Sequence, residues 1–214
     1  MSRPPFDPSL YLVVGPDDAA GRDLIGLVLD AVAGGVTMVQ LRQKRDAGRA
    51  FVESARALAD VLRPKGVPLI VNDRVDVALA AGADGVHVGQ DDMSAVDARR
   101  LIGEHALLGL SITTLAEARA LDADVVDYAG VGPVFATPTK LDAAPPLGIA
   151  GTRDVCRALR VPIVAIGGIS LSNAHEVLSA GVHGLAVVSA ICSAPDARVA
   201  AAGLTACVRA AMAS

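Results

Sequence analysis

Short apolar runs recur along this chain of 214 residues, and each is followed by a longer segment in which apolar positions return every three or four residues. The short runs are typical of buried strands, and the longer segments are typical of amphipathic helices. Alternating strands and helices predict a parallel α/β fold. The eight predicted strands cover residues 11–14, 37–41, 69–71, 85–88, 107–110, 128–131, 163–166 and 185–188.

The predicted helices carry apolar stripes and recognisable ends. Residues 49–63 place Phe51, Ala55 and Leu58 on one face, and residues 170–180 begin with a serine, which commonly caps helices. Such units also suit an open, doubly wound sheet, but their even spacing and short final helix favour a closed barrel. We therefore predict an α/β protein with a single (β/α)8 TIM barrel over residues 1–214 and an active site at the carboxyl ends of its strands.

Composition narrows the classes of partner. Hydrophobic residues make up 52% of the chain, aromatic residues only 2%, and the formal net charge is -4. Nucleic-acid binding is not expected, because stacking surfaces and a basic patch are both missing. We find no signal peptide and no apolar run of about 18 residues, so we expect a cytoplasmic protein that does not enter a membrane. Cys156, Cys192 and Cys207 lack CxxC spacing and are expected to be buried, reduced thiols.

Basic residues follow the second predicted strand. Gln40, Arg42 and Lys44 fall on one side of an extended chain. Arginine presents a planar fork to phosphate, and lysine presents a mobile positive charge. The triplet therefore indicates an anion site, whereas Arg45 and Arg49 nearby fit a solvated basic loop.

Predicted strands three and four each bring a carboxylate to the same rim. Asp73 follows the third strand directly after Asn72, and Asp92 follows the fourth. Mg2+ prefers one or two carboxylates together with substrate phosphate oxygens and water, so Asp73 and Asp92 are the predicted magnesium ligands. Helix capping is the alternative for Asp73, and for Asp91 it is the favoured interpretation. His87 could face either the barrel interior or the helices, and we assign it no role.

The loops after the later strands carry groups suited to phosphate. A serine after the fifth strand binds a ligand or caps a helix, and the long loop over residues 132–148 is typical of a functional lid. In many barrels the loops after strands seven and eight hold phosphate through backbone N–H groups. The candidate residues in these loops are Ser111, Thr137, Thr139, Lys140, Gly167, Gly168, Val188 and Ser189.

These residues, taken in this order, resemble the thiamine phosphate synthase family from Tyr11 to Ser189. Two positions depart from the expected family pattern, namely Ala136 in place of a proline and Thr113 in place of a histidine. The resemblance implies Mg2+ as the cofactor, held by Asp73 and Asp92. The implied substrate contacts are Gln40, Leu41, Arg42, Gln43, Lys44, Asn72, Ser111, Thr137, Pro138, Thr139, Lys140, Gly168, Val188 and Ser189.

The resemblance also implies an activity. A pyrimidinylmethyl diphosphate (4-amino-2-methyl-5-hydroxymethylpyrimidine diphosphate) would be joined to 4-methyl-5-(2-phosphooxyethyl)thiazole or its carboxylated form, which yields thiamine monophosphate and pyrophosphate. We hypothesise a dissociative mechanism with Arg42, Lys44, Lys140 and Ser111 as catalytic residues, acting through positioning and charge. The alternatives are a thiazole tautomerase and a non-catalytic sensor of phosphorylated ligands on the same barrel. The sequence leaves open whether the chain forms a homo-oligomer.

Overall fold

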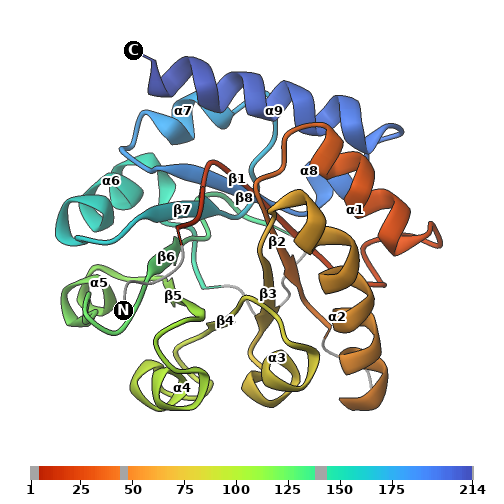
Figure 1. Ribbon diagram of the computed structural model, residues 1–214. Coiled ribbons are helices and arrows are strands. Elements are labelled where there is room, and N and C mark those ends of the chain that lie inside the picture. Colours follow the sequence, from red (N-terminus) through yellow and green to blue (C-terminus); the bar gives the residue numbers. More distant parts are fainter. Residues whose placement is uncertain (1–4, 44–47, 138–143, 214) are drawn as a thin grey trace.

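The computed structural model describes residues 5–43, 48–137 and 144–213. Its strands are all parallel and close into a barrel in chain order, with β8 paired to β1 (Figure 1). The predicted TIM barrel is confirmed, and every strand ends within two residues of its predicted bounds. The strands are β1 (Leu10–Val14), β2 (Met38–Leu41), β3 (Leu69–Asn72), β4 (Gly85–Val88), β5 (Leu107–Ile112), β6 (Tyr128–Val131), β7 (Ile163–Ile166) and β8 (Gly184–Val187).

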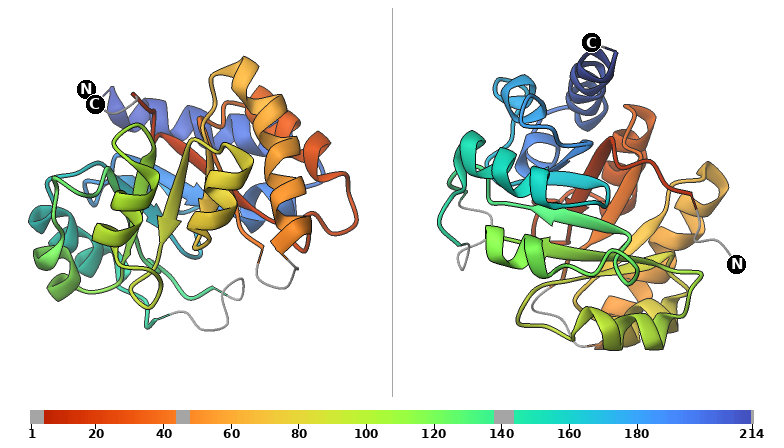
Figure 2. Two further views of the ribbon diagram at one scale, coloured as in Figure 1. Left: turned by 60° about the horizontal axis from the view of Figure 1, so that its bottom comes forward. Right: turned by 90° about the vertical axis from the view of Figure 1, so that its left-hand side faces the viewer.

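Helices surround the barrel, and the last of them, α9, packs against α1, α7 and α8 (Figures 1 and 2). The helix predicted over 49–63 is α2, which begins and ends one residue earlier. The helix predicted from Ser170 begins only at Ala174, because residues before it form a turn. The helices are α1 (Leu24–Ala33), α2 (Gly48–Leu62), the 3-10 helix η1 (Arg63–Lys65), α3 (Val75–Ala81), α4 (Ala95–Ile102), α5 (Leu115–Ala120), α6 (Gly148–Ala158), α7 (Ala174–Leu178), α8 (Ser189–Cys192) and α9 (Ala197–Met212).

The strands separate two apolar regions, because alternate residues of a strand face opposite sides. The larger core lies between strands and helices and consists mainly of Val, Leu, Ile and Ala side chains. The smaller cluster fills the barrel interior and includes both tyrosines of the chain. The interior is therefore packed, and ligands are restricted to its ends. The interior cluster comprises Tyr11, Val13, Met38, Ile70, Leu107, Tyr128, Val164 and Ala186.

A buried ion pair joins α4 to the amino ends of two strands. The Arg99 guanidinium lies 2.5 Å from the Asp127 carboxylate, and the two side chains are 7% and 3% exposed. Asp127 also accepts the Leu108 N–H of β5 at 2.6 Å, and Arg99 donates to three backbone carbonyls, those of Gly103, Ala106 and Val125. These bonds compensate for the removal of both charges from water.

The cysteine prediction is confirmed only in part. All three cysteines are free thiols, but Cys192 is buried whereas Cys156 and Cys207 are half-buried. Burial raises the pKa of Cys156 to about 11 and that of Cys192 to about 12. Among the residues that the structure describes, we find no helix with the length and apolar character that a bilayer span requires.

Candidate active site

The end of β2 carries the first group of predicted ligand contacts. Gln40 is 4% exposed, and its amide nitrogen donates to the Tyr11 hydroxyl at 2.9 Å inside the barrel. Leu41 packs in the outer core, which leaves only its backbone to meet a ligand. Arg42 and Gln43 follow the strand as half-buried residues at its carboxyl end. Lys44, predicted beside them, lies outside the described residues.

Asp18, in the loop after β1, was not predicted from the sequence. Its carboxylate accepts the Gly15 N–H at 2.8 Å. Burial raises the pKa of Asp18, although the Gly15 hydrogen bond and the positive charge of Arg42 oppose the shift. Arg42 therefore has an acidic neighbour from the loop after β1, and a single aspartate in a loop of the sequence gives no signal for it.

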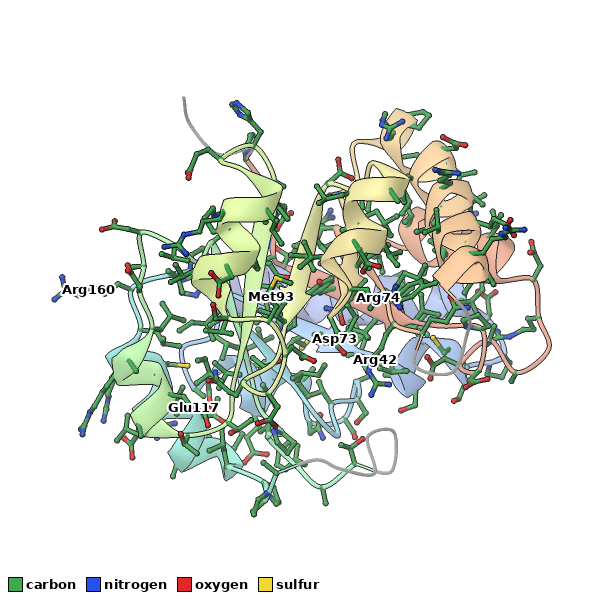
Figure 3. The ribbon with its side chains drawn as sticks, turned by 90° about the horizontal axis from the view of Figure 1, so that it is seen from below. Arg42, Asp73, Arg74, Met93, Glu117 and Arg160 are labelled. Carbon is green, nitrogen blue, oxygen red and sulfur yellow. The ribbon has the colours of Figure 1, made fainter. Side chains whose placement is uncertain are left out.

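The two predicted metal ligands come from neighbouring strand ends. Asp73 directly follows β3, and its N–H donates to the His87 carbonyl of β4 at 2.8 Å. Its φ of 61° is a left-handed conformation that few non-glycine residues adopt except Asn and Asp. Asp73 and Asp92 line one surface pocket together with Arg74, Met93 and Leu101. Figure 3 labels three of the lining residues, Asp73, Arg74 and Met93. The two residues that follow β3 and β4 therefore border the same pocket, and their role as metal ligands stays a prediction.

Asp92 is held by its own loop, and the favoured role for Asp91 is wrong. One Asp92 oxygen accepts the Gly89 N–H at 2.8 Å. The cap of α4 is Ser94, whose hydroxyl accepts the Asp97 N–H at 3.1 Å. Helix α4 begins three residues later than a cap at Asp91 would require, because the loop after β4 first folds around Asp92.

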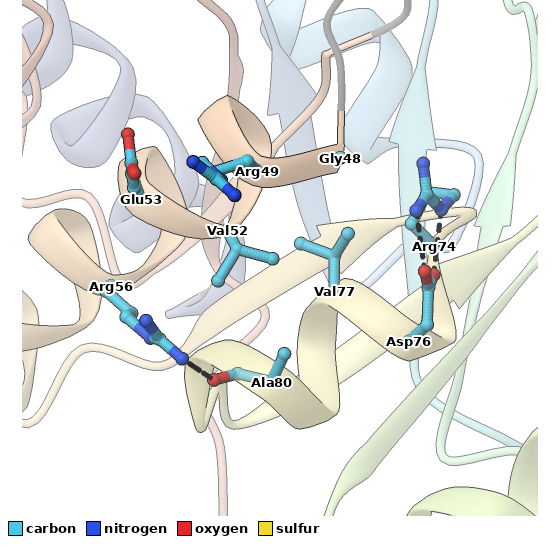
Figure 4. A pocket seen from close by; sticks show the side chains of 9 residues that line it. All are labelled: Gly48, Arg49, Val52, Glu53, Arg56, Arg74, Asp76, Val77 and Ala80. Carbon is cyan, nitrogen blue, oxygen red and sulfur yellow. Dashed lines mark hydrogen bonds and ion pairs between the residues drawn. The ribbon is translucent and has the colours of Figure 1, made fainter.

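A second pocket lies between α2 and α3 and contains none of the predicted site residues (Figure 4). Arg56 donates to the Ala80 carbonyl at 2.9 Å. Arg74 forms two bonds with the Asp76 carboxylate, at 2.7 and 2.6 Å, and this pairing lowers the pKa of Asp76. The Arg56 bond links α2 to α3, and the Arg74 pair lies within the start of α3, so these two arginines have protein partners in the pocket.

Ser111 lies near the end of β5, which is two residues longer than predicted. Its hydroxyl is 2.9 Å from Nε2 of His87, and Nδ1 of His87 is 3.2 Å from the Tyr128 hydroxyl. His87 is 8% exposed and faces the barrel interior, which resolves the alternatives left open for it. Sequence reasoning missed both Tyr128 and Tyr11, since only barrel closure brings these residues together.

Thr113, a departure from the family pattern, belongs to the start of α5. Its hydroxyl donates to the Glu117 carboxylate at 3.0 Å, and its N–H donates to the same carboxylate at 2.6 Å. Glu117, labelled in Figure 3, also forms a capping box with Thr114. Both polar groups of Thr113 therefore stabilise a helix end.

The base of the long loop after β6 is tied to its surroundings. The Phe135 N–H donates to the Gly167 carbonyl at 3.1 Å, and the Gly148 N–H donates to the Val134 carbonyl at 2.9 Å. Gly168 has a φ of 64°, and a Cβ there would lie 2.8 Å from the Ala136 carbonyl oxygen. Glycine is thus required for loop packing, in addition to any approach of an anion.

The remaining predicted contacts lie on the β6, β7 and β8 loops. Val188 directly follows β8 and precedes α8, and Ser189 is exposed as the first residue of that helix. Asn173 holds the glycine turn after β7, because its amide donates to the Gly168 carbonyl at 2.9 Å and accepts the Ser170 N–H at 2.8 Å. Thr137 is half-buried in the loop after β6. Pro138, Thr139 and Lys140 lie outside the described residues.

Comparison with known proteins identifies the family. The profile described as "Thiamine monophosphate synthase" matches residues 10–191. A "Thiamine-phosphate synthase" of Albidiferax ferrireducens is 55% identical over 90% of this chain and 88% of that protein, and one of Solidesulfovibrio magneticus is 56% identical over 93% and 94%. A solved "Thiamine phosphate pyrophosphorylase" of Pyrococcus furiosus has a TM-score of 0.87 at 36% identity, over 96% of this chain and 97% of that one. The prediction from the sequence is confirmed: this chain belongs to the thiamine monophosphate synthase family.

Proposed function

We propose that this barrel is a thiamine phosphate synthase that joins a pyrimidinylmethyl diphosphate to a thiazole phosphate, or its carboxylated form, and releases pyrophosphate. The observation that carries the proposal is the set of polar groups at the carboxyl ends of β2 to β5, on a chain of this family. Catalytic groups of TIM barrels lie at this end of the strands. The proposal treats residues 1–214 as one domain with this single active site. The groups on described residues are Gln40, Arg42, Asn72, Asp73, Asp92 and Ser111.

The reaction requires charge stabilisation and needs no protein nucleophile. The bond between the pyrimidinylmethyl carbon and the diphosphate oxygen breaks, and its electron pair leaves with pyrophosphate. The thiazole nitrogen then forms the new C–N bond with its lone pair. Arg42 stabilises the negative charge that develops on the leaving group, together with Lys44 and Lys140 from the segments not described. Ser111 donates a hydrogen bond to the same substrate.

Asp73 and Asp92 are the residues that would hold Mg2+. Their chemistry fits the ion, because both are carboxylate residues that line one pocket and Mg2+ commonly binds through one or two carboxylates plus phosphate oxygens and water. Bound there, Mg2+ would supply positive charge to the diphosphate oxygens. Gly89 assists by fixing one Asp92 oxygen through its N–H, so that the carboxylate has a defined orientation.

The thiazole phosphate is assigned to the loops after β6, β7 and β8. The backbone around Gly168 and the N–H groups at Val188 and Ser189 offer hydrogen-bond donors to a phosphate group. Thr137 lies on the adjacent loop, followed by Pro138 and Thr139 in the segment not described. In this proposal the two phosphorylated substrates bind on opposite sides of one barrel mouth, with their reacting atoms between them.

Formation of thiamine phosphate from the two substrates tests the proposal. We expect product from the purified protein with Mg2+, and a strong loss after chelation or in Asp92→Asn, which removes a charge but keeps the side-chain shape. Asp91→Asn is the matched control, because Asp91 is an exposed neighbour outside the pocket. Folded protein that forms no product would reject the synthase, and full activity of Asp92→Asn would reject the metal assignment.

The alternatives receive less support. A thiazole tautomerase releases no pyrophosphate and a sensor performs no reaction, so neither needs paired metal carboxylates. In addition, the relatives described above are named as synthases. We further propose a cytoplasmic location, which agrees with three free thiols in one chain.

A further inference from the structure

A row of polar side chains crosses the otherwise apolar barrel interior. The Gln40 amide nitrogen is 2.9 Å from the Tyr11 hydroxyl, which is 2.8 Å from the Tyr128 hydroxyl. The Tyr128 hydroxyl is 3.2 Å from Nδ1 of His87, and Nε2 of that histidine is 2.9 Å from the Ser111 hydroxyl. The row therefore begins and ends at residues of the candidate active site, Gln40 on β2 and Ser111 on β5. We call these five residues the interior row.

Two glycines leave room for the interior row. A Cβ at Gly109 would lie 2.3 Å from Nδ1 of His87 and 2.5 Å from the Tyr128 hydroxyl oxygen. A Cβ at Gly130 would lie 2.9 Å from Cε1 of the same imidazole. Gly109 of β5 is paired with His87 of β4 on one side and with Tyr128 of β6 on the other. The His87 and Tyr128 side chains therefore meet over Gly109, which has no side chain. The barrel thus provides a defined space for the imidazole.

The positions of the hydrogen atoms in the interior row follow from the requirement that each buried donor has an acceptor. Within the part of the chain that the structure describes, the hydrogen-bond partners of the Tyr11 hydroxyl are the Gln40 amide nitrogen and the Tyr128 hydroxyl. The amide nitrogen is a donor, so the hydroxyl hydrogen of Tyr11 must go to Tyr128. A buried hydroxyl without an acceptor is costly, so Tyr128 in turn donates to Nδ1 of His87.

We propose that the interior row fixes His87 as the neutral tautomer protonated on Nε2, and that His87 thereby makes the Ser111 hydroxyl a hydrogen-bond donor to substrate. Nε2–H donates to the Ser111 oxygen, which leaves the hydroxyl hydrogen of Ser111 directed away from the imidazole. In the other neutral tautomer Nε2 would be unprotonated, and the Ser111 hydroxyl would donate its hydrogen to Nε2 and not to substrate. The inference rests on the proposed function only where it assigns the acceptor, a phosphorylated pyrimidine.

The proposal makes Tyr11, Tyr128 and His87 positioning residues that act through Ser111. A donor that is already oriented suits an anionic leaving group, because no hydroxyl rotation is needed as charge develops. Substrate need not contact the tyrosines, which are both at most 2% exposed. Their burial raises the pKa of each phenol well above its ordinary value, which keeps both hydroxyl hydrogens in place at neutral pH.

The tautomer can be measured without any activity assay. 15N NMR of protein labelled at its four histidines separates protonated from unprotonated ring nitrogens. The set of signals that is lost in the His87→Gln variant belongs to His87. We expect a protonated Nε2 and an unprotonated Nδ1. A protonated Nδ1, in the other tautomer or in the imidazolium, overturns the proposal. In Tyr128→Phe we expect the shift of Nδ1 to change while the protein stays folded, and an unchanged shift counts against the proposed row.

Kinetics test the link to Ser111. Ser111→Ala is expected to lower kcat/KM roughly tenfold to a hundredfold, which is typical of a lost hydrogen bond to a charged group. Tyr128→Phe is expected to lower kcat/KM roughly twofold to tenfold. In the Ser111→Ala background, Tyr128→Phe should cause no further loss, whereas additive losses overturn the proposal. Unfolding midpoints of all variants control for stability. A wild-type protein that forms no thiamine phosphate would reject the proposed function, while the NMR result would still decide the tautomer.

Discussion

The hydroxyl oxygens of Tyr11 and Tyr128 lie 2.8 Å apart inside the barrel, and these are the two tyrosines of a chain that has no tryptophan. Their rings meet edge to face, with centroids 5.8 Å apart. The pair therefore joins β1 and β6, which are not neighbours in the sheet, and reports on the barrel interior in any measurement of tyrosine absorbance.

Tyrosine ionisation is the first prediction. Burial raises the pKa of both phenols, so the folded state keeps protons that the unfolded chain releases near pH ~10. Stability should be independent of these groups below about pH 9 and should fall above about pH 10, by at most roughly 1.4 kcal/mol per tyrosine per pH unit. Tyrosinate absorbance and urea unfolding, measured together, should change over the same pH range.

The matched control for this prediction is Tyr11→Phe, which should reduce the slope of stability against pH in the alkaline range. Tyrosinate absorbance that appears near pH ~10 in protein that is still folded would show that the phenols are not protected.

The second prediction concerns the buried ion pair of Arg99 and Asp127. Asp127→Asn or Arg99→Met leaves a buried charge without its partner, and we expect a loss of about 3–5 kcal/mol in the free energy of unfolding. Arg100→Met is the control on the same helix, since Arg100 and Asp97 form an exposed pair, and its effect should stay below about 1 kcal/mol. Equal effects of the Arg99 and Arg100 substitutions in denaturant unfolding would contradict the prediction.

The third prediction tests the start of α4. Ser94→Ala should lower the free energy of unfolding by about 1 kcal/mol, because the Asp97 N–H loses its acceptor. Asp91→Ala should have a much smaller effect, since Asp91 does not cap this helix. Chemical unfolding of both variants distinguishes the two residues, and a larger effect of the Asp91 substitution would restore it as the cap.

The fourth prediction separates backbone conformation from loop contact. Gly168→Ala introduces a Cβ 2.8 Å from the Ala136 carbonyl oxygen in a left-handed conformation, whereas Gly181→Ala introduces one with no atom within 4 Å. Both should lose roughly 1–2 kcal/mol from the conformation. Only Gly168→Ala should also raise the KM for the thiazole phosphate, because it displaces the loop after β6. Equal KM values for the two variants would show that this loop does not need the glycine.

The fold could be predicted from the sequence because apolar strand runs and helical stripes are local signals. The barrel rim could be predicted as well, since polar residues directly after parallel strands converge at one end, as Asp73 and Asp92 do. The contacts that were missed depend on closure and register. Which strands become neighbours decides that Gly109 lies opposite His87 and that Asp18 lies near Arg42. No local pattern in a single sequence encodes this pairing of strands.

The Arg99–Asp127 pair lies at the amino ends of the strands, and the rim residues lie at their carboxyl ends. The hydrogen bonds described above for Arg99 and Asp127 involve no rim residue, so we expect substitutions of this pair to leave the rim contacts intact. If higher thermal stability is needed, by engineering or by adaptation to a higher growth temperature, the amino end is the part of the barrel to change. The loops at the carboxyl end, which we propose bind the substrates, can then be changed to bind new ligands on a more stable barrel.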